Sequence, residues 1–254
     1  MIITKLEHGE ILELRLERPP ANALNPALVN ALRNTIETAP RSDARALVLS
    51  GMPGMYSGGL DVLELMALDA AAMGHFWRDF IGLLQSIALS PLPIAAAITG
   101  HSPAGGAVLA IYCDMRVAAQ GNFKIGLNEV RVGLPVPRVI HAALARLVGE
   151  RQAERLTVSG LLISPDEALR VGLVDQVVAE ETVIPAALTW CRELLALPPW
   201  AMSITRELAR ADFKKMFDEL GGRTHEEMTR VWFSDEAQAS LRVLLARLAA
   251  RKKH

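Results

Sequence analysis

The order of apolar and polar residues divides the chain into two regions. In the first two-thirds, short β-branched runs alternate with helical patterns, whereas the chain after about Glu180 has a helical period and few strand signals. A helix is expected over residues 27–38, because Leu28, Leu32 and Ile36 fall on one face. Strands are predicted at residues 2–6, 11–17, 46–50, 94–99, 116–119 and 174–178. Strands that alternate with helices predict an α/β fold.

The helical region near the C-terminus is rich in large apolar side chains, including three of the four tryptophans. The apolar stripe of its last helix is Leu241, Leu244, Leu245 and Leu248. Short helices this apolar need a surface to pack against. We therefore predict a core with the functional site in residues 1–190, and a helical region in residues 191–254 that docks on this core or on another subunit. An oligomer is expected.

The composition is that of a globular protein. The 254 residues are 51% hydrophobic and 22% charged, and a chain of this length buries roughly 70–75% of its unfolded surface. The formal net charge of −1 gives no field that attracts a phosphate backbone, so nucleic acid is not expected as a partner. Because no apolar run reaches membrane-spanning length, no membrane is expected either.

The cysteines and the first residues bear on the compartment. Cys113 at a predicted helix start and Cys191 inside another helix give neither a disulfide framework nor a zinc-ligand spacing, so no metal is expected. They are expected to be buried residues of a protein in a reducing compartment. The opening MIITKLEHGEILELRLERP carries acids and differs from a signal or transit peptide. These features predict a cytoplasmic location.

Two glycine-rich segments each follow a predicted strand and lead into a helix. They are SGMPGMYSGGLD at residues 50–61 and ITGHSPAGGAVLAIYCD at residues 98–114. In the first segment, Gly58 and Gly59 permit a sharp turn that leaves the Leu60 amide facing a cavity at a helix start. Neither segment has the lysine and hydroxyl of a phosphate loop or the GxGxxG of a dinucleotide turn, which disfavours a nucleotide triphosphatase and a Rossmann dehydrogenase.

The second segment repeats the arrangement of the first. Pro103 suits the beginning of a helix, and Gly105 and Gly106 remove side chains where the backbone approaches a ligand, which frees the Gly105 N–H. Two such amides can converge on one carbonyl oxygen. With the carboxylate of Glu129 in IGLNEVRVG, they suffice to remove a proton beside a thioester and to stabilise the resulting enolate. The residues therefore predict an enzyme that acts on acyl-CoA.

Glu129 is the candidate base. Without other signals, an isolated glutamate between apolar residues is more often a solvated or salt-bridged surface residue. Its apolar neighbours are Ile125, Leu127, Val130 and Val132. Partial shielding by these side chains is expected to raise the pKa of Glu129 by desolvation and to make the ionised carboxylate a stronger base.

Several motifs resemble the crotonase superfamily, also called the enoyl-CoA hydratase/isomerase family. YSGGLD is similar to its first oxyanion turn, HSPAGGAVLAIYCDMRVAA to its second and RPPANALN to its first CoA loop. This resemblance extends to the last helix and implies a spiral of ββα units with a C-terminal helical oligomerisation region. It implies that the N–H groups of Leu60 and Gly105 form an oxyanion hole. The residues that it implies for binding CoA and substrate are Pro20, Ala21, Ala23, Ser57, Gly58, Gly59, Asp61 and Val62.

The acid-base residues of this superfamily decide the reaction. Hydratases that resemble this chain carry two glutamates, and here the first position falls on Val108 and the second on Glu129. Hydration usually divides its proton transfers between two groups, whereas one carboxylate can take a proton from C2 and return one to C4. GLNE, the PAGG turn, SGGLD and WFSDEAQASL resemble mitochondrial-type 3,2-enoyl-CoA isomerases. The chain is therefore predicted to isomerise 3-enoyl-CoA to 2-enoyl-CoA in fatty acid β-oxidation, with Glu129 as proton shuttle.

An enoyl-CoA hydratase and a non-catalytic CoA-binding protein of the same fold remain alternatives. Asp61 is the candidate second carboxylate of a hydratase, although Asp61 and Asp114 are expected to cap helices or to pair with arginines such as Arg116. His101 is interpreted as a packing or hydrogen-bonding residue. Candidates for an acyl tunnel, for most of which core filling is the commoner role, are Met52, Met55, Leu63, Leu65, Met66, Phe76 and Phe80.

The resemblance also implies the assembly and the ligand. It implies a homotrimer or a dimer of trimers built on the helical tail, with acyl-CoA as substrate. No cofactor is expected, since coenzyme A is part of the substrate. The basic residues at the end of the chain either form a solvated face or contact the CoA phosphates; they are Arg247, Arg251, Lys252 and Lys253.

Overall fold

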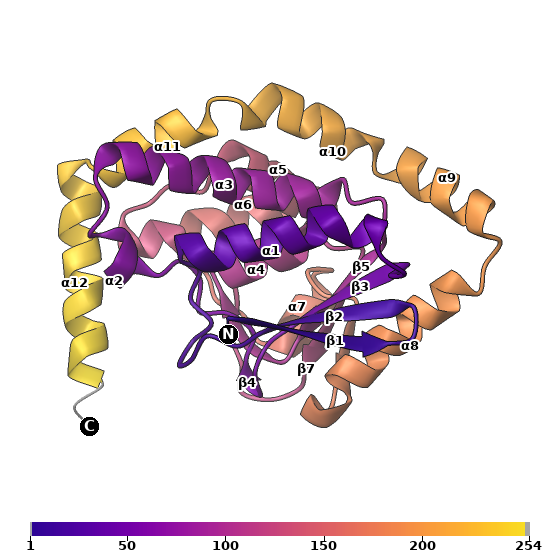
Figure 1. Ribbon diagram of the computed structural model, residues 1–254. Helices are drawn as coiled ribbons and strands as arrows, with labels where there is room; N and C mark the ends of the chain where they lie inside the picture. The colour runs from indigo at the N-terminus through magenta and orange to yellow at the C-terminus, as the bar shows by residue number, and fades with distance from the viewer. Residues whose placement is uncertain (1, 252–254) are drawn as a thin grey trace.

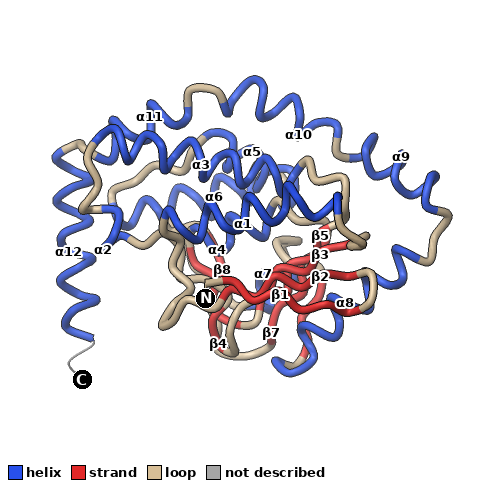
Figure 2. Tube along the Cα trace, viewed as in Figure 1, coloured by secondary structure: helices blue, strands red, loops and turns tan. Residues whose placement is uncertain are grey.

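The computed structural model describes residues 2–251 and has a twisted main sheet between helices, with a smaller sheet beside it (Figures 1 and 2). The main sheet has the order β1-β2-β3-β5-β7-β9. Its strands are β1 (Ile3–His8), β2 (Ile11–Leu16), β3 (Ala46–Ser50), β5 (Ile94–Ile98), β7 (Met115–Ala119) and β9 (Gln176–Val178). β1 and β2 are antiparallel, and the other neighbouring pairs are parallel. All six predicted strands are confirmed, with ends moved by at most two residues.

The smaller sheet explains how the glycine segments are placed. Its parallel strands are β4 (Gly54–Met55), β6 (Gly100–Pro103) and β8 (Ile125–Gly126), in the order β4-β6-β8. Each follows the end of a main-sheet strand, since β3 leads to β4, β5 to β6 and β7 to β8, and each precedes a helix. The strand-strand-helix unit therefore recurs, and the expected spiral of ββα units is confirmed.

Helices cover both faces of the main sheet. α1 (Pro26–Thr38) and α3 (Ala70–Ala88) pack together on one face, while α8 (Val183–Leu195) packs across β3, β5 and β7 on the other (Figure 2). Side chains along β3 alternate between the two layers, because successive residues of a strand point to opposite faces: Leu47 and Leu49 join the first core, and Ala46 and Val48 the second.

The remaining helical elements of the core connect or follow these units. They are η1 (Ala39–Arg41), α2 (Val62–Leu65), α4 (Gly105–Ile111), η2 (Glu129–Val132), α5 (Arg138–Val148), α6 (Glu150–Ser159), α7 (Pro165–Arg170) and η3 (Glu180–Thr182). Among residues 2–251 there is no helix with the length and apolar character that crossing a membrane requires.

The C-terminal tail is helical, as predicted, and runs around the outside of the α1 and α3 layer (Figure 1). Its elements are α9 (Pro199–Ala209), α10 (Ala211–Met216), the π-helix η4 (Phe217–Gly221), α11 (Thr224–Trp232) and α12 (Asp235–Arg251). α11 packs on α3, and Trp232 is fully buried. This part of the tail therefore docks on its own core.

An ion-pair cluster holds α9 and the start of α10 against the core. Asp114 lies 2.8 Å from Arg206 and 3.2 Å from Arg210. The expected pairing of Asp114 with arginines is therefore confirmed, but the arginine named as an example, Arg116, pairs with Asp175 at 2.7 Å. The reason is topological, because Asp114 precedes β7 and faces the tail, whereas the Arg116 backbone and side chain both contact the residue that precedes β9.

Three other expectations differ in detail from the structure. Cys113 is buried but follows the end of α4 at Ile111 instead of starting a helix. Pro103 ends β6, so α4 begins two residues later. The expected boundary between residues 190 and 191 falls within α8, a helix of the core. Lys252 and Lys253 lie outside the described residues.

Candidate active site

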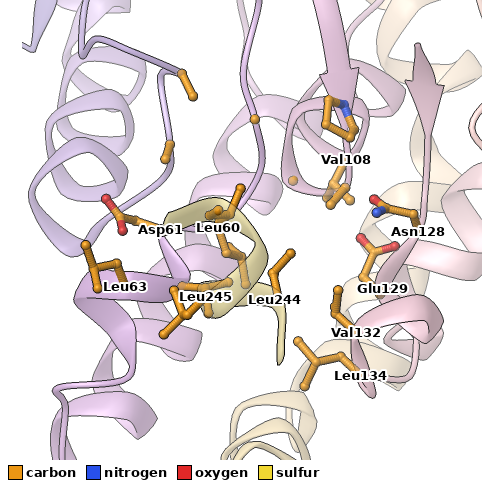
Figure 3. Close-up of a pocket in the computed structure, with 18 of the residues that line it drawn as sticks. Leu60, Asp61, Leu63, Val108, Asn128, Glu129, Val132, Leu134, Leu244 and Leu245 are labelled. Atoms are coloured by element: carbon orange, nitrogen blue, oxygen red, sulfur yellow. The ribbon is translucent and has the colours of Figure 1, made fainter. Parts of the chain in front are cut away.

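A cavity of about 1090 Å³ lies where the two glycine-rich turns meet η2 and the tail (Figure 3). Its walls come from the loop before α1, both turns, α3, η2, α11 and α12. The ionisable residues on its surface are Arg18, Asp61, His101, Lys124 and Glu129. Most of the remaining lining is apolar, which suits a ligand with a long hydrocarbon part.

The first turn carries the backbone from β4 to α2. Gly59 has φ +88°, a conformation that favours glycine. Gly59 accepts a hydrogen bond from the Leu24 N–H at 2.7 Å, and the Asp61 N–H donates to Leu24 at 3.0 Å. Leu60 is therefore held on both sides by the loop before α1. Asp61 then caps α2 by accepting from the Glu64 N–H at 3.1 Å.

The second turn carries the backbone from β6 to α4. Ala104 has φ +47°, which is rare for a residue with a Cβ and costs about 1–3 kcal/mol. Its N–H donates to Gly126 at 2.8 Å, so the small sheet fixes this conformation. Gly105 follows as the first residue of α4, where an N–H has no partner within the helix.

The two turns touch. A Cβ at Gly59 would lie 3.0 Å from the Ala104 Cβ and 3.2 Å from the Gly105 nitrogen. Within the described residues, neither the Leu60 N–H nor the Gly105 N–H donates a hydrogen bond, and both residues line the cavity. Two free backbone donors from different units therefore lie at one place, beside the dipole of α4.

The loop before α1 is fixed against the first turn. The N–H of Gly58 donates to Ala21 at 2.7 Å, and Ser57 Oγ donates to the Asn22 carbonyl at 2.8 Å. Asn22 has φ +48°, and its side-chain amide donates to the carbonyls of Met55 and Tyr56. Sequence reasoning missed Asn22. The available signal was its residue type, since asparagine adopts a left-handed backbone conformation more readily than most other residues that have a Cβ.

Most residues expected to contact CoA or substrate line the cavity. Those that do are Pro20, Ala21, Ala23, Gly58, Asp61 and Val62. Ser57 and Gly59 do not line it. Ser57 is fully buried and supports the Asn22 loop, and Gly59 supports the contact between the turns. Both residues therefore support the cavity wall without contacting the cavity.

Glu129 begins η2 and lines the cavity opposite the first turn (Figure 3). Its Oε2 is buried and has no hydrogen-bond partner within the described residues. Burial raises the pKa of Glu129 to about 7, and a hydrogen bond from its own backbone N–H offsets this only in part. The expected direction of the shift is confirmed. Val132 lines the same cavity, whereas Val130 is 39% exposed and contributes little shielding.

The other candidate acid-base groups are absent or engaged. Val108 lies on the Glu129 side of the cavity and carries no ionisable group (Figure 3). Asp61 caps α2 and lies 2.7 Å from Arg18. His101 Nδ1 accepts the Lys124 backbone N–H at 3.2 Å, and its ring packs edge-on against Phe123. The described residues contain no group of three or more metal-ligating side chains.

The last helix forms a wall that sequence reasoning did not assign to the site. The α12 residues on the cavity surface are Leu244, Leu245, Ala246, Leu248 and Ala249. Figure 3 shows Leu245 by Leu60 and Leu63, and Leu244 between Leu60 and the Glu129 side. Met55, Leu63 and Phe80 also line the cavity, as considered for an acyl tunnel, whereas Met52, Leu65, Met66 and Phe76 do not. Trp77 and Met228 line it in addition.

Comparison with known proteins gives one consistent family. The family model described as enoyl-CoA hydratase/isomerase matches residues 7–242. Human mitochondrial enoyl-CoA delta isomerase 1 is 32% identical over 242 residues, which cover 94% of this chain and 80% of that protein. The probable enoyl-CoA hydratase EchA17 of Mycobacterium tuberculosis is 35% identical over 196 residues, or 76% of this chain and 74% of that one.

The solved structures agree with this result. The crystal structure of human mitochondrial delta3-delta2-enoyl-CoA isomerase superposes with a TM-score of 0.94 and 30% identity, covering 99% of this chain and 100% of that one. An enoyl-CoA hydratase/isomerase family protein from a Pseudomonas species superposes with a TM-score of 0.83 and 26% identity, over 89% of this chain and 98% of that one.

Proposed function

The chain belongs to the enoyl-CoA hydratase/isomerase family, and we propose that it moves the double bond of a 3-enoyl-CoA to the 2 position through a thioester enolate. It is an acyl-CoA enzyme of the enoyl-CoA isomerase/hydratase type. What we propose beyond this is which reaction the enzyme catalyses and what each residue does in it.

In the proposed mechanism, the free N–H groups of Leu60 and Gly105 bind the thioester oxygen. A carboxylate in water is too weak a base for a thioester α-proton, so the charge that develops on this oxygen must be stabilised. One backbone-type donor in such a site contributes about 3–4 kcal/mol. Glu129 Oε2 takes the proton from C2, the electron pair spreads from the thioester oxygen to C4, and the same carboxyl group returns a proton to C4.

The observation that carries the choice of isomerisation is the number of free carboxylates at the cavity. Among the described residues Glu129 Oε2 has no hydrogen-bond partner, the position expected for a second glutamate is Val108, and Asp61 is held by Arg18 and by the N-terminus of α2. Adding water to a double bond usually needs a second acid-base group. One free carboxylate suits a proton shuttle between C2 and C4.

The other residue roles and the assembly are part of the same proposal. Pro20, Ala21, Ala23 and Gly58 bind the CoA part of the substrate from the loop and first turn, with Ser57 and Gly59 fixing that turn from behind. Asp61 and Val62 bind the substrate at the start of α2. The enzyme needs no cofactor, works in the cytoplasm in β-oxidation, and forms a homotrimer or a dimer of trimers through its helical tail.

Hydration is the second candidate, because a relative named as a probable enoyl-CoA hydratase is 35% identical over 76% of this chain, while the human isomerase is 32% identical over 94% of it. Parallel ultraviolet assays with 3-enoyl-CoA and 2-enoyl-CoA separate the two reactions. The proposal expects rapid formation of 2-enoyl-CoA and hydration at least about 100-fold slower, in line with the loss of one acid-base group. Rapid formation of 3-hydroxyacyl-CoA would contradict it, and no turnover of either substrate would favour a non-catalytic CoA-binding protein.

A further inference from the structure

Asn128 lies next to Glu129 and lines the same cavity, yet the proposed reaction gives it no task. It occupies the N-cap position of η2, but its side chain does not cap that helix. Its Oδ1 is buried and has no hydrogen-bond partner within residues 2–251, and the same holds for Glu129 Oε2. Figure 3 shows both side chains on the wall that includes Val108.

Two buried acceptors on neighbouring residues require a donor, since a buried acceptor without a hydrogen-bond partner has lost its contacts with water and gained nothing in their place. An enoyl chain does not supply that donor, because it has only C–H bonds between the thioester carbonyl and C4. Val108, Val132 and Leu134 are apolar neighbours on the cavity surface and do not supply it either. Water has two O–H donors, and a polar, roomy site with two to four partners holds an ordered water.

We propose that Asn128 Oδ1 and Glu129 Oε2 together hold one water molecule, and that through this water a solvent hydrogen replaces the substrate hydrogen during the double-bond shift. The inference rests on the proposed isomerase function. It makes Asn128 a positioning residue that acts on the water and, through it, on Glu129.

The exchange step balances. Glu129 takes a proton from C2 and becomes a neutral acid. The acid gives this proton to the water while the water returns one of its own protons to the same carboxyl group, so both partners end with the charge they began with. Glu129 then delivers the solvent-derived proton to C4. Burial raises the pKa of Glu129 to about 7, so its neutral acid form is populated near neutral pH, as the exchange step requires.

The test is isomerisation of 3-enoyl-CoA in D₂O, with deuterium at C4 of the product measured by NMR at low conversion, before the reverse reaction adds label. The wild-type enzyme is expected to place deuterium at C4 in most turnovers. Asn128→Leu removes the acceptor and is expected to lower C4 deuterium at least about threefold, with substrate hydrogen retained instead. Asn128→Asp keeps an acceptor and is expected to restore solvent label. Asn122→Leu, at an exposed asparagine nearby in the chain, is the matched control and should behave as wild type.

The outcomes separate this inference from the proposed function. Two results would overturn the water site while isomerisation stands. One is wild-type product in which the hydrogen added to C4 is the one removed from C2, and the other is equal C4 deuterium in wild type and Asn128→Leu. If 3-enoyl-CoA is not converted, the proposed function fails. Crystal structures then test separately whether the water is bound. Density for a water bridging Asn128 Oδ1 and Glu129 Oε2 is expected in wild type and not in Asn128→Leu; no such density in wild type would refute the site.

Discussion

Glu129 combines a buried carboxylate with a free oxygen, and its pKa of about 7 sets the pH range in which it can act as a base. Since the proposed reaction begins with the ionised form, kcat is expected to rise as the pH increases through about 7 and to fall about tenfold per unit below it. A pH profile of kcat with 3-enoyl-CoA measures this. An acid limb centred near 4.5, the ordinary value for glutamate, would show that Glu129 is solvated in the working enzyme.

The same burial carries a cost in stability. A carboxyl group whose folded pKa exceeds its unfolded pKa binds more protons when folded, so it lowers the stability progressively as the pH rises from the unfolded value to the folded value. Glu129→Gln is therefore expected to raise the free energy of unfolding by up to about 3 kcal/mol at pH 8.5, because the pKa rises from 4.5 to about 7 and about 1.4 kcal/mol corresponds to each unit of pKa shift. The gain should shrink toward pH 5. Urea unfolding at both pH values measures it, and a gain equal at both would contradict the assigned cause.

Single residues also show where sequence reasoning stops. Leu60, Gly105, Val108 and Glu129 were found because each stands in a motif with a defined neighbour, and the structure places all four on one cavity. Asn22 was missed because its left-handed backbone depends on hydrogen bonds to Met55 and Tyr56, more than thirty positions away. A local pattern does not contain such a long-range bond.

At the scale of elements, the two turns work as a pair because they touch. Gly59→Ala is expected to push the turns apart, since its Cβ would lie 3.0 Å from the Ala104 Cβ and the φ of +88° disfavours a side chain. We expect kcat to fall about 100-fold, as for the loss of one oxyanion donor, with the far-ultraviolet circular dichroism preserved.

Gly9→Ala is the matched control for this variant. Gly9 has a similar φ of +69°, but a Cβ there would meet nothing within 4 Å, and it lies in the β1–β2 hairpin. It should cost stability without changing kcat. Equal losses of activity in the two variants would mean that backbone strain alone, and not the contact between the turns, explains the effect.

The elements were predictable in proportion to their length. β3 and β5 are almost entirely apolar runs, and β3 was placed at the correct residues for that reason. β4 and β8 have two residues each and give no periodic signal. The third strand-strand-helix unit, whose helical element begins at Glu129, was consequently not recognised as a repeat of the other two.

For the whole molecule, the helical tail has a split role that its sequence did not reveal. A leucine stripe predicts a buried face for α12 but does not say against which surface, and in the structure Leu241 is buried while Leu244 and Leu245 line the cavity. α9 differs, because its apolar residues face outward: Trp200 is 78% and Leu208 is 73% exposed. Exposed apolar residues on one helix face are typical of an interface with another chain.

The proposed assembly predicts the effect of charge on that face. Trp200→Glu combined with Leu208→Glu is expected to convert the oligomer to monomers, because two carboxylates would have to be buried without partners. Ala209→Glu, at an exposed position of the same helix outside the i, i+4 spacing of Trp200 and Leu208, is the control and should leave the assembly intact. Light scattering coupled to size-exclusion chromatography gives the masses. A monomeric wild type, or a double variant with unchanged mass, would contradict an assembly built on α9.

The proposed mechanism depends most on one carboxyl group acting across from two backbone amides. The direct measurement is the rate of 2-enoyl-CoA formation from 3-enoyl-CoA by wild type, by Glu129→Gln and by Glu150→Gln, which changes an exposed glutamate at the start of α6. We expect Glu129→Gln to lose at least about 100-fold in kcat with little change in substrate binding, and Glu150→Gln to match wild type. A Glu129→Gln enzyme that isomerises 3-enoyl-CoA at the wild-type rate would refute the mechanism.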